Sequence, residues 1–228
     1  MTTVLKDDPI YELRLYKVAP GRISHMEERV QQDLCTIFPR HGIRPVGGWR
    51  VVAGPNAPLY IYLTPFRHMQ ERSDAWAGFY SDPAWAECRT RTNAGSELVQ
   101  RYDILFVRAI SGWTPEAAVA AGHPAPLMEM VIQEVAVGQT VAVRAEVLEG
   151  SLPALRDAGA SVHGVFEVMS GGAMPAIVMF LGWTSIEQRE LAMAALDARQ
   201  LSLRAAGRPA LLERSDQYLM RTVPVEWK

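Results

Sequence analysis

Val18-Ala19-Pro20-Gly21 in the first half of the chain returns as Val135-Ala136-Val137-Gly138 in the second half. The two stretches lie 117 positions apart, and further residues coincide at the same shift without a gap. The coinciding pairs are Glu12 with Glu129, Gly42 with Gly159, Trp49 with Phe166, Gly54 with Gly171, Pro58 with Pro175 and Phe66 with Trp183. Turn glycines, a strand aromatic residue and a loop proline recur in register, which chance rarely arranges. The sequence therefore predicts two copies of one structural unit.

Each copy shows the same run of elements: strand, helix, strand, strand, helix, strand. Alternating apolar and polar residues indicate the strands, and longer helical patterns separate them. In the first copy we expect strands at 10–18, 46–53, 59–66 and 102–110, and helices at 24–38 and 69–99. In the second copy we expect strands at 127–137, 162–169, 176–182 and 217–223, and helices at 141–158 and 185–206. The pattern predicts an α+β fold of two β-α-β-β-α-β units.

Two breaks in these patterns set boundaries. The helical pattern at 69–99 is expected to break at Asp82-Pro83, because proline suits the first position of a new helix. Residues 111–126 hold three prolines and two glycines and are predicted to be a linker with a short helical turn at 115–121. The predicted domains are therefore 1–110 and 127–228.

The composition argues against several classes of protein. The chain has 228 residues, of which 49% are hydrophobic and 21% charged, enough apolar material for a buried core. Its net charge of −2 gives no electrostatic reason to expect nucleic acid or an anionic membrane as a partner. No run of about eighteen apolar residues is present, so no membrane span is expected. Cys35 and Cys88 fit no metal or redox spacing, and no signal pattern opens the chain, so we expect free thiols and a cytoplasmic location.

The first copy also carries a series of short motifs in a fixed order. These are Tyr11-Glu12-Leu13-Arg14 with Tyr16, Pro20-Gly21-Arg22, His41-Gly42-Ile43, Val46-Gly47-Gly48-Trp49, Gly54-Pro55, Glu71-Arg72, Ser81-Asp82-Pro83-Ala84-Trp85 and Ile104-Leu105. With these motifs, residues 9–110 resemble the NIPSNAP family. The second copy resembles it more weakly, since Val131 stands at the place of Arg14 and Gln133 at the place of Tyr16.

This resemblance implies the dimeric α+β barrel class, in which ferredoxin-like units pack their antiparallel sheets face to face around a cleft. It leaves open whether the barrel closes within one chain or across a homodimer, and a homodimer is expected. The class includes cofactor-free monooxygenases, isomerases, polyketide cyclases and haem-binding proteins, so the resemblance does not fix a reaction. The third strand departs from the family pattern, because Tyr62 and Thr64 stand where the family shows His and, two residues on, Trp.

The first strand supplies the centre of a candidate site. Side chains alternate between the two faces of a strand, so Glu12, Arg14 and Tyr16 share one face. The apolar residues between them are expected to pack on the helices, which leaves the polar face turned toward the second sheet. There Arg14 would bind a carboxylate or an enolate-like oxygen, Glu12 would act as a general base, and Tyr16 would complete the catalytic group.

Other strands are expected to line the same space. Tyr60, Tyr62 and Thr64 share one face of the third strand, and Tyr62 is assigned the stabilisation of a developing oxyanion. Trp49 and Glu129 are added to Tyr60 and Thr64 as substrate-binding residues. Aromatic walls with a few convergent polar groups are the usual composition of a small-molecule site.

Two alternatives qualify these assignments. Glu12 and Arg14 would equally form a buried ion pair with no catalytic role. His163 is a further catalytic candidate, since it shares a predicted strand face with Val165 and Glu167, and a histidine beside a carboxylate makes an oriented base. Four residues span about 13 Å along a strand, which argues against direct contact between His163 and Glu167.

The sequence contains no His/Cys cluster and no Gly-rich nucleotide loop, so no metal or other cofactor is expected. We predict an enzyme of secondary, aromatic or polyketide metabolism with cofactor-independent acid–base chemistry: isomerisation, cyclisation, lyase chemistry or oxygenation. Its expected partner is a small apolar or aromatic metabolite. A non-catalytic ligand-binding or scaffold protein and a haem-binding protein are the alternatives.

Overall fold

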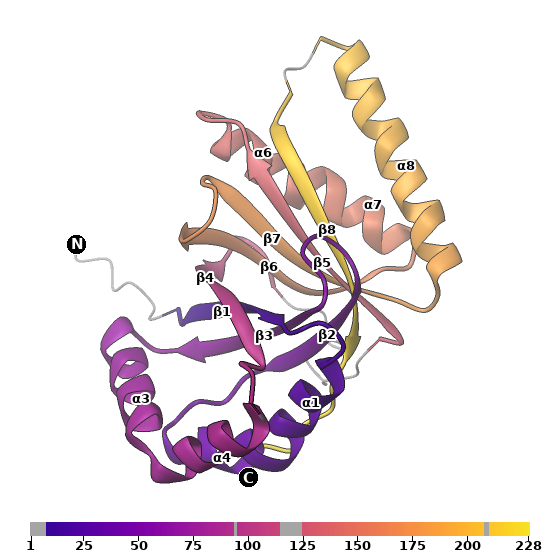
Figure 1. Ribbon diagram of the computed structural model, residues 1–228. Coiled ribbons are helices and arrows are strands. Elements are labelled where there is room, and N and C mark those ends of the chain that lie inside the picture. Colours follow the sequence, from indigo (N-terminus) through magenta and orange to yellow (C-terminus); the bar gives the residue numbers. More distant parts are fainter. Residues whose placement is uncertain (1–7, 94, 115–124, 208–209) are drawn as a thin grey trace, which may run out of the picture. The chain divides into compact units, whose positions relative to one another are not determined.

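The computed structural model describes residues 8–93, 95–114, 125–207 and 210–228 (Figure 1). They form two compact units. Unit 1 consists of the described residues up to 52 together with 56–108 and 222–228, and unit 2 of the described residues in 53–55 and 109–221. The domain boundaries predicted from the sequence stay a prediction. The helical turn predicted at 115–121 lies outside the described residues.

Unit 1 has the predicted order of elements. Its strands are β1 (Ile10–Val18), β2 (Gly47–Ala53), β3 (Leu59–Phe66) and β4 (Val99–Ala109). Its first helical stretch contains a π-helical segment and consists of α1 (Ile23–Glu28), η1 (Arg29–Leu34) and α2 (Cys35–Arg40). Its second consists of α3 (Met69–Ser81) and α4 (Pro83–Asn93). The predicted break is confirmed, because Asp82 Oδ1 accepts a hydrogen bond from the Ala84 N–H at 2.8 Å and Pro83 begins α4.

The strands of unit 1 form an antiparallel sheet in the order β2-β3-β1-β4. Arg14 of β1 lies opposite Tyr62 of β3, and Tyr16 lies opposite Tyr60 of β3 and Tyr102 of β4. Residues directly opposite one another project from the same face of a sheet. The candidate site residues of β1 and β3 therefore do share one face, as their alternation predicts.

Unit 2 repeats this arrangement. Its strands are β5 (Leu127–Val135), β6 (Ser161–Ser170), β7 (Ala176–Trp183) and β8 (Leu212–Thr222), and they pair antiparallel in the order β6-β7-β5-β8. Its helical segments are α6 (Thr140–Glu146), η2 (Val147–Ser151), α7 (Leu152–Asp157) and α8 (Ile186–Ala205). The π-helical segment of unit 1 recurs here as η2, and β8 begins earlier than predicted.

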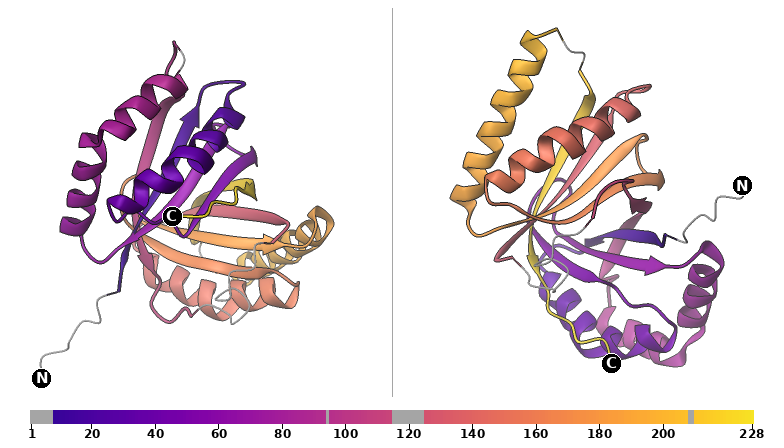
Figure 2. Two further views of the ribbon diagram at one scale, coloured as in Figure 1. Left: turned by 90° about the horizontal axis from the view of Figure 1, so that it is seen from below. Right: turned by 180° about the vertical axis from the view of Figure 1, so that it is seen from behind.

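Helices cover one face of the sheet in each unit, as both views in Figure 2 show. In unit 1 the core on this face joins Phe38 of α2 and Trp76 and Phe79 of α3 with Tyr60 and Tyr62 of β3. In unit 2 the corresponding core joins residues of α6, η2, α7 and α8 with apolar side chains of β5, β6 and β7. The face-to-face packing of sheets expected from the sequence stays a prediction.

The recurring turn glycines have a backbone cause. Gly21 and Gly138 have φ angles of 75° and 84°, and Gly42 and Gly159 have φ angles of 73° and 89°. These angles lie in the left-handed region, which side chains with a Cβ rarely adopt. The turn before the first helix and the turn after it therefore need glycine in both units.

The recurring strand aromatics also have a cause in packing. A Cβ built on Gly47 would overlap the Trp49 ring, and a Cβ built on Gly164 would overlap the Phe166 ring. In each case the ring lies over the backbone two residues before it. Only a residue without a Cβ leaves room for the aromatic ring at this position. This explains why the glycine–aromatic pair recurs at the 117-residue shift.

The last described residues belong to unit 1. The Val223 N–H donates to the Gly48 carbonyl at 2.9 Å, and the Lys228 N–H donates to the Cys35 carbonyl at 2.9 Å. Between these bonds Trp227 stacks on Phe38, with ring centroids 6.0 Å apart and an interplanar angle of 13°. Residues that follow the second sheet in sequence thus complete the core of the first unit.

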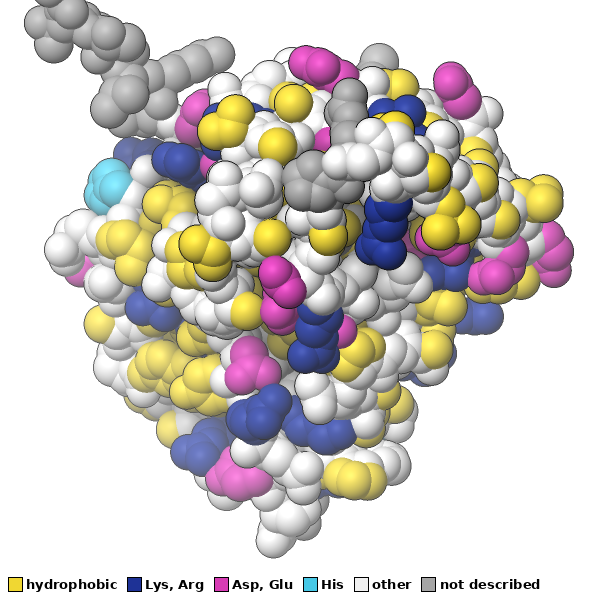
Figure 3. All heavy atoms as spheres, turned by 90° about the horizontal axis from the view of Figure 1, so that it is seen from above, with side chains coloured by type: hydrophobic (Ala, Val, Ile, Leu, Met, Phe, Trp, Pro, Cys, Tyr) yellow, Lys and Arg dark blue, Asp and Glu magenta, His cyan; other side chains and the backbone are white. Residues whose placement is uncertain are grey.

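The helices within the described ranges include none that is both long and apolar enough to cross a membrane. On the face drawn in Figure 3, basic and acidic side chains lie interspersed with apolar ones. This mixture agrees with the small net charge of the chain.

Candidate functional site

The polar face of β1 packs against the helices of unit 1. Tyr16 and Tyr62 contact the core formed by the helices, and the Arg14 guanidinium lies over the Trp76 ring of α3, 3.6 Å from its centroid. The prediction that this face turns away from the helices is therefore wrong. Alternation alone does not reveal the direction, because the opposite face is also buried: Leu13 is 0% exposed.

Glu12 is held between two arginines. One carboxylate oxygen accepts a hydrogen bond from Arg14 Nε, and the other accepts one from Arg72 Nε of α3. The Glu12 residue is 1% exposed. Because both oxygens accept hydrogen bonds from guanidinium groups, Glu12 forms ion pairs with two arginines inside the unit.

Arg14 is a buried cation, also 1% exposed. Its Nη1 donates a hydrogen bond to the Tyr16 hydroxyl at 2.9 Å. Burial lowers the pKa of Arg14, but the nearby Tyr62 and Tyr16 hydroxyls and the Glu12 carboxylate raise it, and the pKa ends above its ordinary value. The guanidinium stays charged, and its stacking on an indole adds a cation–π contact.

Two tyrosines extend the network from Arg14. The Tyr62 hydroxyl donates to the Tyr16 hydroxyl at 2.8 Å. The Tyr16 oxygen thus accepts two hydrogen bonds, from Tyr62 and from Arg14, which leaves its own proton to be donated to a ligand. Burial raises the pKa of both phenols, so both are protonated at neutral pH.

The Tyr16 ring lies beside the surface of the unit. It is half-buried, and its centroid is 5.5 Å from that of Tyr102, which is 53% exposed. Tyr80 of α3 is 55% exposed and is one of the groups near Arg14 that raise its pKa. Tyr16 therefore lies between the buried Arg14 and an exposed aromatic rim of Tyr80 and Tyr102.

Tyr60 and Thr64 lie on the same sheet face but take no part in this network. The Tyr60 and Thr64 hydroxyls and the Trp76 indole N–H are buried and have no hydrogen-bond partner among the described residues. Burial raises the pKa of Tyr60. Buried polar groups are usually satisfied, so these three atoms are exceptions within the core of unit 1.

Trp49 and Glu129 lie apart from these residues. Trp49 is opposite Ile61 in the β2–β3 register and so projects from the other face of the sheet from Tyr60 and Tyr62. Its predicted place beside the two tyrosines is wrong, because β2 places Gly48, not Trp49, on the helix side. Glu129 belongs to unit 2, in the core beneath α8.

Glu129, like its counterpart Glu12 in unit 1, accepts hydrogen bonds from an arginine of a helix. Arg189 of α8 donates two hydrogen bonds to Glu129 Oε1, at 3.0 and 2.6 Å. Arg189 stands 117 positions after Arg72, as Glu129 does after Glu12. A strand glutamate bound by a helix arginine is thus a shared structural feature of both units. Sequence reasoning missed Arg72, although its recurrence at the same shift is a signal that could have found it.

Unit 1 adds three residues that unit 2 does not have. At the 117-residue shift, the places of Arg14, Tyr16 and Tyr62 are taken by Val131, Gln133 and Met179. Val131 and Met179 are buried in the apolar core of unit 2. The Arg–Tyr–Tyr group is therefore an addition to a unit that folds without it.

His163 does not share a continuous strand face with Glu167. The β6–β7 register shifts between Val162 and Gly164, and this irregularity interrupts the predicted alternation. His163 Nε2 lies 3.0 Å from Ser161 Oγ. Glu167 instead accepts a hydrogen bond from Arg144 Nε at 2.7 Å. His163 and Glu167 thus each have a hydrogen-bond partner other than the one that a catalytic pair requires.

His41, at the end of α2, binds Asp82. The distance from His41 Nε2 to Asp82 Oδ2 is 2.9 Å. This bond ties the first helical stretch to the start of α4. Among the described residues, no group of three or more His, Cys, Asp and Glu side chains comes together to hold a metal ion.

Solved structures share the fold over nearly the whole chain. An anthrone oxidase-like protein has a TM-score of 0.58 at 12% identity, over 97% of this chain and 96% of that chain. A mutant chlorite dismutase from Candidatus Nitrospira defluvii has a TM-score of 0.56 at 7% identity, over 94% of this chain and 92% of that chain. At such identities the likeness shows a common fold only. No curated protein matches the sequence.

The family comparison agrees with the motifs of the first copy. Residues 11–111 match the family described as NIPSNAP. The resemblance seen over residues 9–110 is thereby confirmed, and the matched segment holds all of Glu12, Arg14, Tyr16, Tyr62 and Arg72. The NIPSNAP match thus covers the first unit, a little under half of the chain.

Proposed function

We propose that this chain is a small-molecule enzyme that stabilises an enolate or phenolate oxygen at Arg14, Tyr16 and Tyr62, without a metal or other cofactor. The observation that carries the proposal is the difference between the two units. Burying a guanidinium and two phenols costs desolvation, whereas the valine and methionine of unit 2 pack without that cost. A bond to Glu12 accounts for the arginine but not for the two phenols, so a ligand is the better explanation for the tyrosines.

The geometry suits one kind of chemistry. Tyr16 has a proton to donate because its oxygen already accepts from Arg14 and Tyr62. A donor backed by a buried cation stabilises negative charge on a substrate oxygen, which is the role of an oxyanion hole. Glu12 serves as a positioning residue in this proposal rather than as a base, since both of its oxygens are bound.

The proposed substrate is an aromatic ketone with an acidic C–H group. Stabilisation of its enolate oxygen makes the C–H group more acidic, and solvent water accepts the proton. The enolate then reacts with dioxygen itself: anthrone and O₂ give anthraquinone and water. Anthrone is the first substrate to test because one protein that shares the fold is named anthrone oxidase-like. A homodimer and a cytoplasmic location belong to the proposal as well.

The test compares three single-hydroxyl variants in an anthrone oxidation assay that follows oxygen uptake and quinone absorbance. Tyr16→Phe is expected to lower kcat by about 100-fold to 1,000-fold, the usual effect of losing one oxyanion donor. Tyr62→Phe is expected to have a smaller effect in the same direction. Tyr60→Phe is the matched control, since its hydroxyl lies on the same sheet face but has no partner among the described residues. Equal rates for Tyr16→Phe and Tyr60→Phe would exclude the proposed role.

A second candidate is a protein that binds an aromatic ligand without converting it. The specific observation in its favour is that Glu12 provides no free base. Quenching of tryptophan fluorescence by anthraquinone, weakened by Tyr16→Phe, together with no oxygen uptake above the uncatalysed rate, would favour this candidate over the enzyme.

A further inference from the structure

A groove of about 240 Å³ opens on unit 1 between the first helical stretch and α4. Its lining is rich in basic side chains, among them Arg22, His25, Arg29 and Arg91. Two carboxylates, Glu28 and Asp33, also line it. Asp33 Oδ1 and Arg91 Nη2 form an ion pair, so their charges compensate each other.

Arg29 is the unusual member of this lining. It is 4% exposed, yet the groups to which it donates are neutral: Nε donates to Thr92 Oγ1 and Nη2 donates to Asn93 Oδ1, both at 2.7 Å. It forms no ion pair with a carboxylate among the described residues, and its Nη1 has no acceptor among them. Burial is the largest influence on the pKa of Arg29 and lowers it; Cys88, Glu97 and Asp33 act in the opposite direction, and the charge of Arg22 adds to the lowering. A buried cation without an anion is rare in proteins.

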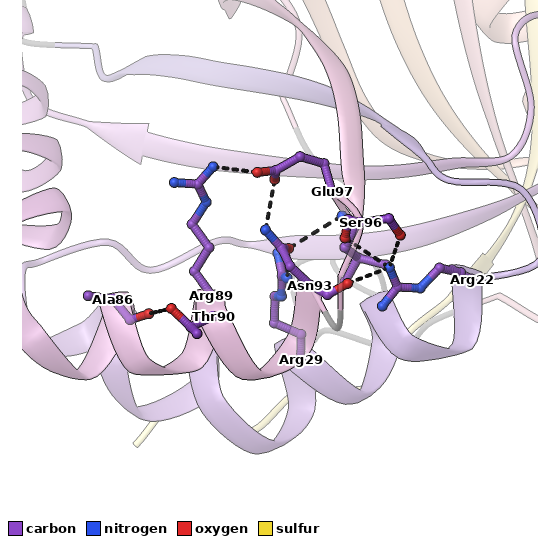
Figure 4. Close-up of polar contacts among 9 residues, drawn as sticks. Arg22, Arg29, Ala86, Arg89, Thr90, Asn93, Ser96 and Glu97 are labelled. Atoms are coloured by element: carbon purple, nitrogen blue, oxygen red, sulfur yellow. Dashed lines mark hydrogen bonds and ion pairs between the residues drawn. The ribbon is translucent and has the colours of Figure 1, made fainter.

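Arg22 differs because its charge has a structural role. Its guanidinium donates to the carbonyls of Thr92 at 2.7 Å, Asn93 at 2.9 Å and Ser96 at 3.1 Å, which lie at and just beyond the end of α4. A cation at this position satisfies open carbonyl groups and interacts favourably with the helix dipole. Figure 4 shows Arg22 directed at this end of α4, with Arg29 beneath Asn93. The carbonyls account for the charge of Arg22, whereas Arg29 has no ion pair with a carboxylate among the described residues.

Unit 2 provides an internal comparison. A groove of about 820 Å³ occurs at the matching place, where Gln139 and Glu146 stand 117 positions after Arg22 and Arg29. There the charge is reversed and compensated, because Arg199 Nε donates to Glu146 Oε1 at 3.0 Å. The fold thus forms this groove in both units without requiring an arginine, and in unit 1 the arginine at this place has no ion pair with a carboxylate among the described residues.

We propose that the basic groove of unit 1 binds a small oxyanion, the phosphate or carboxylate group of a metabolite, at Arg29. Arg29 Nη1 supplies two N–H donors in a fixed plane, which suits two oxygens of one such group. His25 supplies another: its Nδ1 lies 3.2 Å from Arg22 Nε and accepts from it, so the hydrogen of the ring is on Nε2. The site is separate from Arg14 and does not depend on the proposed enzyme activity.

The experiment is calorimetric titration of the full chain with inorganic phosphate at constant ionic strength, with chloride as the reference anion. Arg29→Gln is expected to weaken binding by about tenfold or more, the usual effect of losing a hydrogen bond to a charged group. The matched control is Arg101→Gln, which removes the same charge from an exposed ion pair with Asp103 in the same unit. This variant is expected to leave phosphate binding unchanged.

Two further variants keep the test decisive where Arg29→Gln does not fold. His25→Ala alters an exposed side chain and is expected to weaken binding severalfold. Asp33→Asn removes a negative charge and releases Arg91, so it is expected to tighten binding, an effect that a purely structural role of the cluster does not produce. Separate titrations with glycerol phosphate and succinate identify the preferred group. Binding that chloride reproduces, or that is unchanged in His25→Ala and Asp33→Asn, would overturn the proposal.

Discussion

Unit 2 shows how a buried strand glutamate is satisfied without Arg14. Trp183 Nε1 donates to Glu129 Oε2 at 2.9 Å, and Arg189 binds the other oxygen. The residue that stands 117 positions before Trp183 is Phe66, which has no N–H to donate. In unit 1 Arg14 therefore provides the hydrogen bond that an indole provides in unit 2.

Arg14→Val, which introduces the residue of unit 2, should remove this bond from Glu12. The loss of a hydrogen bond to a charged group costs about 1.5–3 kcal/mol. Arg72 stays bound to the other oxygen, so the cost should remain below the roughly 3–5 kcal/mol of an unpaired buried charge. We expect a net destabilisation of about 2 kcal/mol, or a fall in Tm of about 4–8 °C for a chain of this size.

Adding Phe66→Trp to Arg14→Val should restore a donor near Glu12. Phe66→Trp alone overfills the core and should cost about 1–3 kcal/mol. If the new indole binds the oxygen that Arg14 has left, the double variant should be more stable than the two single effects predict together. We expect a coupling of about 1–2 kcal/mol.

The coupling is measured by urea denaturation of the wild type, both single variants and the double variant. Circular dichroism is the probe, because an added tryptophan changes the fluorescence. Effects of Arg14→Val and Phe66→Trp that simply add, within about 0.5 kcal/mol, would refute the equivalence between Glu12 and Glu129. The presence of Arg14 beside Glu12 would then need a reason other than the replacement of the Trp183 hydrogen bond.

Three other outcomes follow from single contacts. Tyr60→Phe removes a buried hydroxyl with no partner among the described residues and should raise the free energy of unfolding by up to about 1 kcal/mol in denaturant titration; a clear loss would show that the hydroxyl is satisfied. Gly47→Ala should lower it by about 1–3 kcal/mol, because the new Cβ overlaps the Trp49 ring, and unchanged stability would contradict this packing. The hydrogen bond to His41 and then the Ala84 N–H lower the pKa of Asp82 from 3.8, so this carboxylate stabilises the fold above that pH and the contribution is lost as pH falls through its lower folded value. Asp82→Asn should therefore be less stable than the wild type at pH 7, and the gap should close near pH 2; a gap of constant size would rule out this linkage.

The order of the elements could be predicted because its signals are local. Strand alternation, helical periodicity and turn glycines act over a few residues, and the duplication shows each signal twice. β1 and β3 have the predicted bounds, and α4 begins at the predicted Pro83. The last strand was placed too late, because its first residues, from Leu212, are mostly charged or polar and lack the alternation of an amphipathic strand.

The direction of the candidate site could not be predicted. Alternation shows that Glu12, Arg14 and Tyr16 share a face, but it does not show which neighbour that face meets. Hydrophobicity usually decides this question, and here it misleads, because the polar face packs under α3 while Leu13 on the other face is equally buried. A guanidinium can take the core position because Trp76 stacks on it and Glu12 pairs with it.

The sequence by itself determined the repeat, the order of strands and helices, and the family of the first unit, since each rests on residues close together in the chain or on identity at a constant shift. The tertiary structure alone decided which residues from distant segments meet. Arg72 reaches Glu12 from a helix 60 positions away, and the groove at Arg29 needs α4 beside η1. Such contacts depend on how helices pack on a sheet, and that packing is the sum of many weak contacts over the whole unit rather than a property of any short segment.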